Sequence, residues 1–519
     1  MQALLYLLVI KFALMIDYTS SAQLTIMEFE TPFRSSLDPE NKWVKLSESV
    51  PWDKFASIYM KAMDLGFGRP GVSPRTVLGA LIIKHLMNLD DRGTIEAIQE
   101  NPYMQFFVGL SDFTTKPIFD ASLFVDIRKR VGNETFDKLN TQLIEMAAGK
   151  SDAKHNSSPK KKNEDGLPKN KGKLQMDATV ADQYIKYPTD TDLMNSGRKI
   201  LEKIIDTLYE LNDKQGVKPR TYRRIMDKHS LVFSKKRKKK KNEIRKMKHK
   251  LLEHLKRDIS HINKMLDAYE KKGKAFPLKK QQHRQLWIIT TLYEQQREMY
   301  NNLTNTAKNR IVSIHQPHVR PIKRGKQNSE TEFGSKLGVS LDNGFARIDT
   351  LSWDAYNESD DLINSVKSYF QLHGHYPELV QVDKIYHTKK NRKWLMDRNI
   401  RITATPLGRK PKKELTSYQK RKKKQEATER NHIEGKFGQG KNGYNLNKIR
   451  ARLSDTSESW VSCIFFIMNL LNYDKGYFRA VFKRLLSLYF YDGLILLCKY
   501  HVKTHFIINN NNKVGAFSC

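Results

Sequence analysis

The chain has 519 residues, enough for two or three domains with a substantial core. Lysine and arginine number 92 against 56 acidic residues, a net charge of +36. This excess is far larger than solubility requires and favours a polyanionic partner, although a membrane surface could also use such charge. All three cysteines lie near the C-terminal end, which excludes a disulfide framework for the core, and none has the spacing of a zinc finger.

Both ends of the chain differ from the rest of the sequence. The residues through Ala22 are apolar and resemble a poor signal peptide, because Lys11 interrupts them and no basic start precedes them. We therefore expect translation to begin at Met27 and residues 1–26 to be a non-structural extension. The C-terminal tail, residues 472–519, holds an apolar stretch that is too short to span a membrane. The sequence predicts a cytoplasmic, nucleoid-associated protein without a membrane partner.

Residues 27–150 predict a helical N-terminal domain for DNA binding or assembly. Apolar residues recur at helical spacing from Leu78 to Leu86, and further helical stretches surround Ile95–Gln99 and cover Leu123–Met146. A domain of this size could hold a helix-turn-helix, or it could be a plain helical bundle that makes protein contacts. Residues 151–172 are rich in Lys, Asn, Ser and Gly, which predicts a disordered basic linker.

Residues 173–471 predict a domain that mixes strands and helices. The first strand is expected over Lys173–Thr179, and a helical insertion over 195–310 interrupts the domain after it. The run Lys235–Lys241 makes this insertion a basic helical hairpin, or a solvated charged helix pair with no ligand. Apolar residues from Ile244 to Tyr269 alternate in threes and fours, which predicts a narrow helical seam and a candidate interface between copies of the chain.

The part of the domain after the insertion alternates strands and helices. In chain order we expect strands over Phe333–Leu341 and Phe345–Leu351, a helix over Leu362–Phe370, a strand over Glu378–Asp383, a helix over Asn391–Arg398, a strand over Ile400–Ala404 and a basic helix over Leu415–Phe437. The first two strands form a hairpin, because Asn343-Gly344 is a strong turn signal. Without the insertion the order is β-β-β-α-β-α-β-α, the order of a ribonuclease-H-like fold. The predicted fold is therefore α/β, a ribonuclease-H-like domain with a large helical insertion, preceded by an all-helical domain.

Three acidic residues lie in sequence contexts that suggest a catalytic role. Asp177 and Asp383 lie in short apolar runs that predict strands, and Glu434 lies on a basic, helix-prone segment. Carboxylates from two strands and a helix can converge on a pair of divalent metal ions, which suits in-line attack at a phosphodiester. With a net charge of +36, the obvious phosphodiester is DNA. The alternative is that these are strand-end or surface charges, with Glu434 a partner for neighbouring lysines.

Longer motifs make the chain resemble bacterial insertion-sequence transposases of the DDE class over about Met27–Leu471. The matching stretches are Asp177–Asp190, Asn357–Ser359, Pro406–Arg409 and Ile433–Gln439, with Leu37–Val44 and Ile118–Asp120 resembling the helical N-terminal domain of the same group. The family's last acidic residue often belongs to a Tyr-Arg-Glu-Lys signature. Arg430, Glu434 and Lys441 keep its offsets, whereas Ala427 stands at the tyrosine position and leaves any role of that tyrosine open.

The resemblance implies a function and a set of site residues. Asp177, Asp383 and Glu434 would be both the catalytic residues and the ligands of two Mg²⁺ or Mn²⁺ ions. The residues expected to contact DNA are Arg430, Lys436, Lys441 and Arg409. The enzyme would cleave DNA at the ends of a mobile element and transfer the strand into a target.

The resemblance also implies partners. These are double-stranded DNA with terminal inverted repeats, the target DNA and, because both ends must be held together, a homodimer or larger assembly. Two alternatives stay open. One is a metal-dependent nuclease that cuts without joining, and the other is a catalytically inactive transposase remnant that only binds DNA.

Overall fold

The computed structural model describes residues 29, 31, 36–63, 71–152, 169–212, 214, 216–273, 275–323, 331–403 and 416–475. The extension 1–26, most of the linker 151–172, the tail after residue 475 and the expected DNA contact Arg409 lie outside these residues. The chain divides into two compact units, one of residues 1–161, 343–346 and 465–519, and one of residues 162–342 and 347–464.

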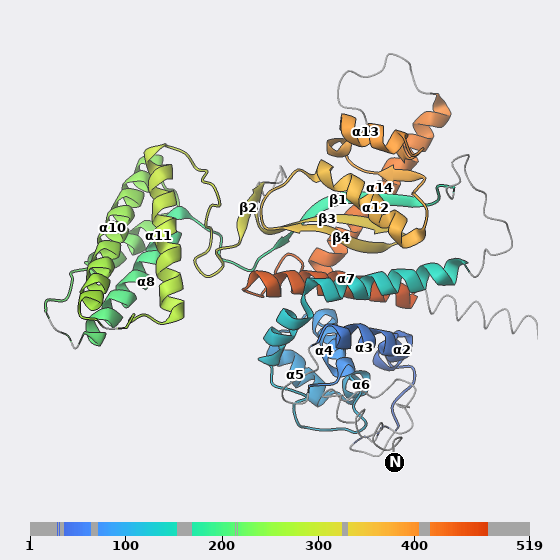
Figure 1. Cartoon of the computed structure of the whole chain (residues 1–519), viewed down its shortest axis with the longest axis horizontal. Coiled ribbons are helices and arrows are strands. Elements are labelled where there is room, and N and C mark those ends of the chain that lie inside the picture. Colours follow the sequence, from blue (N-terminus) through green and yellow to red (C-terminus); the bar gives the residue numbers. More distant parts are fainter. Residues whose placement is uncertain are drawn as a thin grey trace, which may run out of the picture. The chain divides into compact units, whose positions relative to one another are not determined.

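The first unit is helical, as expected for residues 27–150. Its helices are α2 (Lys42–Ser49), α3 (Trp52–Lys61), α4 (Pro74–Leu86), α5 (Asp91–Glu100), α6 (Pro102–Phe107) and α7 (Leu123–Asp152) (Figure 1). The end of a helix over residues 454–475 also belongs to it. Phe466 from that helix meets the Phe55 ring at 5.3 Å and the Phe136 ring at 6.0 Å, which joins three helices in one aromatic core. Among the described residues, no helix is both long and apolar enough to cross a membrane.

The second unit contains a mixed sheet, so the chain combines helices and strands as the sequence predicts. Its strands are β1 (Lys173–Asp182), β2 (Arg320–Lys323), β3 (Thr331–Asp342), β4 (Phe345–Ser352), β5 (Leu379–Gln381) and β6 (Arg401–Ile402). The order β3-β1-β5-β6 has β1 antiparallel to β3 and parallel to β5, and β5 parallel to β6, while both β2 and β4 pair with β3. Asn343 and Gly344 both have positive φ, 48° and 84°, which confirms the predicted hairpin turn between β3 and β4.

On β1 and β5, buried apolar side chains lie on one face of the sheet and the paired glutamines Gln175 and Gln381 lie on the other. Met176 of β1 and Val380 of β5 are buried in a core with Leu362 and Val366 of α12 (Asp361–His373) and Leu395 of α13 (Lys389–Met396). The opposite face carries α14 (Ser417–Gly443), a basic helix that begins close to the predicted position. Strand β2 was not predicted, because a four-residue edge strand that contains proline has little pattern of its own.

The insertion is helical, as expected, and its apolar seam is internal. It consists of α8 (Asp190–Leu211), α9 (Arg223–Lys235), α10 (Lys241–Lys271) and α11 (Lys280–Asn301). Met247, Leu251, Leu255 and Ile262 of the seam are buried in a core that α8 and α11 also supply. The expectation that the seam joins two copies of the chain is therefore wrong, because neighbouring helices of the same insertion already cover these side chains.

Substitution of one glycine, Gly334, can test the pairing of β1 with β3. Gly334 lies opposite Asp182, and a Cβ added to it would lie 1.8 Å from the backbone oxygen of Ala181. Because that oxygen cannot move without breaking the ladder, we expect Gly334→Ala to destabilise the sheet by about 3 kcal/mol. Faster hydrogen exchange of β1 and β3 amides would report it.

The matched control is Gly438→Ala in α14, where an added Cβ meets nothing within 4 Å. Alanine is favoured over glycine in a helix interior by about 1 kcal/mol, so this variant should be at least as stable as the natural chain. Equal exchange in the two variants would contradict the proposed strand packing.

Candidate active site

Two of the three expected acidic residues lie on, or just after, neighbouring parallel strands. In the parallel pairing of β1 with β5, Lys173 lies opposite Leu379 and Gln175 opposite Gln381. Two residues further along, β1 reaches Asp177, whereas β5 has ended and the chain reaches Asp383 at the start of a short 3-10 helix. Side chains alternate between the faces of a strand, so Asp177 belongs to the face of the two glutamines.

The two glutamines fix this face by direct contact. The Gln175 Nε2 donates to Gln381 Oε1 over 2.8 Å, and both side chains are buried. The same nitrogen donates to the backbone oxygen of Glu429 over 2.7 Å, and Gln381 Nε2 donates to that of Glu426 over 3.1 Å. Each glutamine therefore joins its strand to helix α14, directly before the aspartates.

Ion pairs strengthen the attachment of α14 to the strands. Lys173 of β1 contacts Glu429 over 2.7 Å, and Arg401 of β6 contacts Glu426 over 3.0 Å. The Lys173 ammonium is the main cause that holds the pKa of Glu429 below its usual value. Both pairs are partly exposed, so each contributes less than about 1 kcal/mol, and their main effect is to set the rotation of the helix.

Arg430 connects the helix to the expected site. Its guanidinium lies 3.9 Å from Asp177 Oδ2 and 3.2 Å from Glu434 Oε1, one helical turn further along α14. Asp177 is 19% exposed and Glu434 is 55% exposed, so the strand carboxylate is sheltered and the helix carboxylate faces solvent. Among the described residues, no three His, Cys, Asp or Glu side chains are grouped closely enough to hold a metal ion. The structure thus links Asp177 with Glu434 through a cation rather than gathering all three carboxylates.

Asp383 lies just beyond β5, which ends at Gln381. Its carboxylate caps a short 3-10 helix, η4 (Lys384–Tyr386), by accepting from the Lys384 backbone N–H over 2.6 Å. The side chain of Asp383 is exposed, whereas Tyr386 behind it is buried in the apolar core. Burial, with a smaller contribution from nearby acidic groups that include Asp177, raises the pKa of Tyr386. Asp383 is thus held at a strand end with its carboxylate accessible.

The remaining expected DNA contacts differ in their surroundings. The Lys441 ammonium is 3.1 Å from Glu332 Oε1 and 3.8 Å from Asp182 Oδ2, and the side chain is 17% exposed. Lys441 therefore ties the end of α14 to β1 and β3. Lys436 is half-buried on α14, and Arg409 lies outside the described residues.

Sequence reasoning missed the glutamine pair, although a signal was present. Gln175-Met176-Asp177 and Gln381-Val382-Asp383 repeat one pattern, Gln, an apolar residue, then Asp. In two neighbouring parallel strands this pattern places an amide and a carboxylate on one face and an apolar side chain on the other. Glu429 carried no comparable signal, because it is one charge among many on a helix.

The glutamine contact can be tested without any reaction. Gln381→Leu removes three hydrogen bonds and leaves buried partners unpaired, at a cost of about 2 kcal/mol. We expect amides around Glu426 and Glu429, in the first half of α14, to exchange about thirtyfold faster as this part of the helix loosens. Gln281→Leu, at an exposed position of α11, should leave exchange in α14 unchanged. Unaltered protection of α14 in Gln381→Leu would show that the amides do not hold it.

Comparison with known proteins identifies the family. The family described as "Transposase domain (DUF772)" matches residues 32–130, and the family described as "Transposase DDE domain" matches residues 380–471, a range that includes Asp383 and Glu434. The chain is 30% identical over 169 residues to an "Uncharacterized protein ORF8 in nfe locus" from Rhizobium meliloti, covering 31% of this chain and 73% of that protein. No solved structure matches. The chain belongs to the DDE-class transposases of insertion sequences.

Proposed function

We propose that the protein is a metal-dependent DNA transposase that cuts at the ends of its element and joins the freed strand to target DNA. The observation that carries this proposal is that Asp177 and Asp383 each follow, by two residues, the paired glutamines of the parallel strands β1 and β5, with Glu434 of α14 linked to Asp177 through Arg430. The strand order β4-β3-β1-β5-β6, with β1 antiparallel to β3 and parallel to β5, supports a ribonuclease-H-like core.

Asp177, Asp383 and Glu434 are the residues that would hold two Mg²⁺ or Mn²⁺ ions. The donor set fits such ions because hard divalent cations prefer carboxylate oxygens, and the Arg430 guanidinium already lies against two of these carboxylates as a positive charge. Bound ions would supply an activated hydroxyl nucleophile and stabilise the leaving oxygen.

The chain's own residues position the DNA. Arg430 can turn from the carboxylates to a phosphate, because its guanidinium is partly exposed and donates in a fork that matches phosphate oxygens. The exposed run Lys420–Lys424 on the same helix lies upstream of Glu434 and suits contact with a phosphate backbone. Inverted repeats, target DNA and an assembly of at least two copies complete the proposal, with a cytoplasmic, nucleoid-associated location.

A second candidate is a remnant that binds DNA without cutting it. The observation that favours it is that Arg430 lies between Asp177 and Glu434, where a transposase would need room for a metal ion. The two functions differ in chemistry, since a remnant would bind DNA equally well with or without divalent metal.

The decisive substitution is Asp383→Asn. In Mg²⁺, the natural chain should cleave DNA that carries the flanking repeats and join it to a second duplex. The variant should lose at least a hundredfold in rate, because a carboxamide is a poor ligand for a hard cation. Asp397→Asn, an exposed aspartate that ends α13, serves as the control and should retain activity.

Each outcome has a distinct meaning. Joining that requires Mg²⁺ and disappears in Asp383→Asn supports the transposase. Cleavage without joining indicates a nuclease. DNA binding with no cleavage in either Mg²⁺ or EDTA contradicts the enzyme and leaves the remnant.

Substitution of Arg430 tests the proposed metal site without any measurement of DNA cleavage. The guanidinium competes with a metal ion for Asp177 and Glu434, so Arg430→Gln should bind Mn²⁺ about fivefold more tightly, as measured by the free-ion electron paramagnetic resonance signal. Arg421→Gln, at an exposed position of α14, removes the same charge elsewhere on the helix. Weaker Mn²⁺ binding in Arg430→Gln would contradict the competition.

A further inference from the structure

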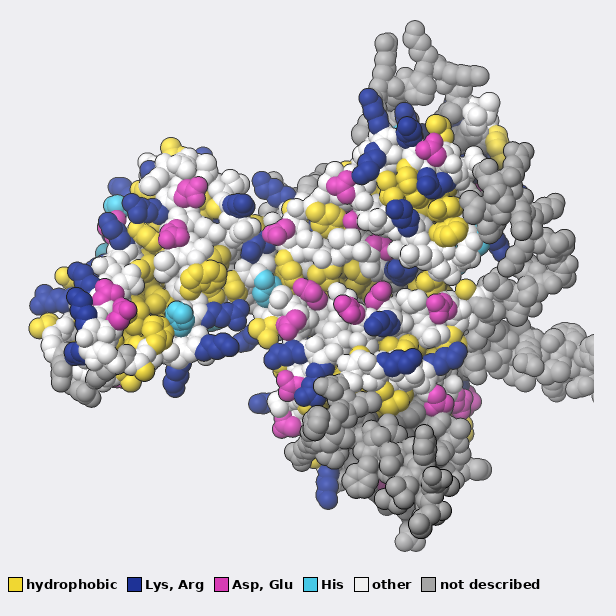
Figure 2. Space-filling model, viewed as in Figure 1, with side chains coloured by type: hydrophobic (Ala, Val, Ile, Leu, Met, Phe, Trp, Pro, Cys, Tyr) yellow, Lys and Arg dark blue, Asp and Glu magenta, His cyan; other side chains and the backbone are white. Residues whose placement is uncertain are grey.

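Positive charge is concentrated in one part of the helical insertion. Residues 218–250 contain sixteen lysines and arginines but only two acidic residues, Asp227 and Glu243. They span α9 and the first turns of α10. Figure 2 shows lysine and arginine side chains along the edges of the insertion, at the left of the view.

Each of the two acidic residues already has a basic partner. Asp227 accepts from Arg198, which is completely buried, and lies 3.7 Å from Lys199. Glu243 pairs with Lys236 over 2.8 Å and accepts from the backbone N–H of Lys240 over 3.2 Å. Both carboxylates are therefore already engaged.

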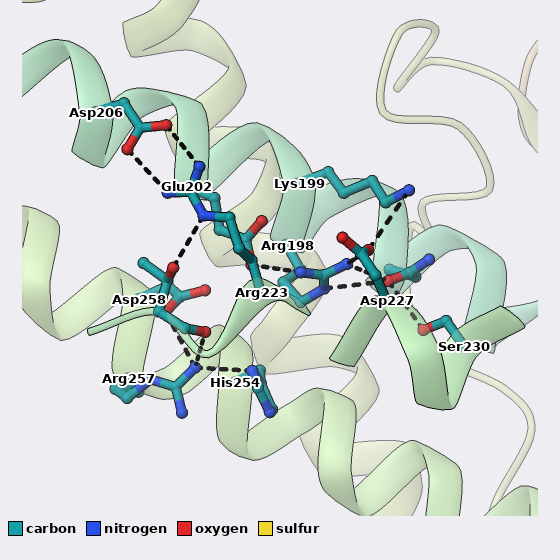
Figure 3. Close-up of polar contacts among 12 residues, drawn as sticks. Arg198, Lys199, Glu202, Asp206, Arg223, Asp227, Ser230, His254, Arg257 and Asp258 are labelled. Carbon is teal, nitrogen blue, oxygen red and sulfur yellow. Dashed lines mark hydrogen bonds and ion pairs between the residues drawn. The ribbon is translucent and has the colours of Figure 1, made fainter. Parts of the chain in front are cut away.

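The other acidic side chains nearby point into the insertion. Figure 3 shows Asp206 bound to Arg223, and Glu202 to Arg198, within a polar network between the helices. Arg223 donates to both oxygens of Asp206 over 2.7 and 2.8 Å. Asp206 also lies 2.7 Å from Lys218. Because these carboxylates are already engaged, the surface lysines and arginines that have no acidic partner keep their charge.

We define the basic corner as Arg224, Lys228, Lys235, Arg237 and Lys238. All five side chains are exposed, and within the described part of the chain none forms an ion pair with an acidic side chain. The first three recur four and seven residues apart on α9, so they share one helical face. The last two follow in the connection to α10.

The start of α10 adds positive potential at this corner. The helix runs from Lys241 to Lys271, and its N-terminal N–H groups carry the positive end of the helix dipole. Acidic residues are normally favoured there, yet Glu243 is the only acidic residue in the first turn. The positive charges at this corner repel one another in the free protein, and a bound anion would reduce that repulsion.

We propose that the basic corner holds the phosphate backbone of duplex DNA without reading its bases. This inference rests on the proposed function in that DNA is the substrate. Lysine predominates in the region, and its ammonium is a point charge that neutralises phosphate without selecting a sequence. The corner is therefore suited to target or flanking DNA rather than to the sequence of the terminal repeats.

An anionic membrane is the rival partner. Exposed Ile225, Leu231 and Val232 give α9 some amphipathic character, which a lipid surface could use. DNA is favoured because the seven residues Lys235–Lys241 contain no apolar side chain that would enter a bilayer.

The test measures binding by the full chain in EDTA, so that no cleavage is needed. The probe is a fluorescent 30-base-pair duplex without the repeats, titrated at several salt concentrations. The test variant changes Lys228, Lys235, Arg237 and Lys238 to Gln. Each lost phosphate contact lowers the slope of log affinity against log salt by about 0.9, so for four lost contacts we expect a slope smaller by about 3.6 and affinity at least a hundredfold weaker at low salt.

The control variant changes Lys256, Lys264, Lys271 and Lys280 to Gln. These exposed lysines lie on the later part of α10 and at the start of α11, so the same charge is removed away from the corner. It should keep most of the affinity and slope. Matching circular dichroism melts for both variants would establish that the insertion remains folded.

Equal loss of DNA binding in both variants, or loss in neither, overturns the inference. So does unchanged DNA binding with lost binding to phosphatidylserine vesicles, which would assign the corner to a membrane. The proposed function fails separately: a natural chain that never cleaves in Mg²⁺, but whose binding depends on the basic corner, would leave this inference intact.

Discussion

The parallel pairing of β1 with β5 is the constraint on which the candidate site depends. It places Gln175 opposite Gln381, and the hydrogen bond between their side chains holds the two strands in that register on the face where the aspartates follow. A shift of one residue would move Asp177 or Asp383 to the apolar face, where Met176 and Val382 are buried. The apolar core that β1 and β5 form with α12 and α13 thus determines that Asp177 lies on the other face of β1.

Helix α14 attaches to that face mainly through polar contacts. Of its 27 residues, Ile433, Phe437 and Gly440 are buried, and all three lie in its second half. Its earlier turns are held by amides and ion pairs, from Lys173 and Gln175 among others. Such contacts orient the helix at little net gain in stability. Glu434 lies in the half of α14 that the buried residues anchor, and under the proposed function it would approach the two aspartates when a metal ion and DNA are bound.

Much of this organisation was predictable from local patterns. Apolar runs located β1, which carries Asp177, and β5, which ends two residues before Asp383; Asn343-Gly344 located a hairpin, and helical periodicity located the insertion. The seam at 244–269 was misassigned to an interface because periodicity shows that an apolar stripe is covered, not which helix covers it. Sequence patterns also could not predict which residues Arg430 and Lys441 contact. These partners depend on how α14 lies on the sheet, which long-range contacts decide.

The central claim is that Asp177 and Asp383 face one shared site beneath α14. The most direct measurement replaces Mg²⁺ with Fe²⁺ and generates hydroxyl radicals at the bound ion, so that the protein backbone is cut beside its metal ligands. The account predicts cuts near residues 177 and 383 in the same sample, both lost in Asp383→Asn. Cuts near only one aspartate, or cuts that survive the substitution, would contradict a shared site.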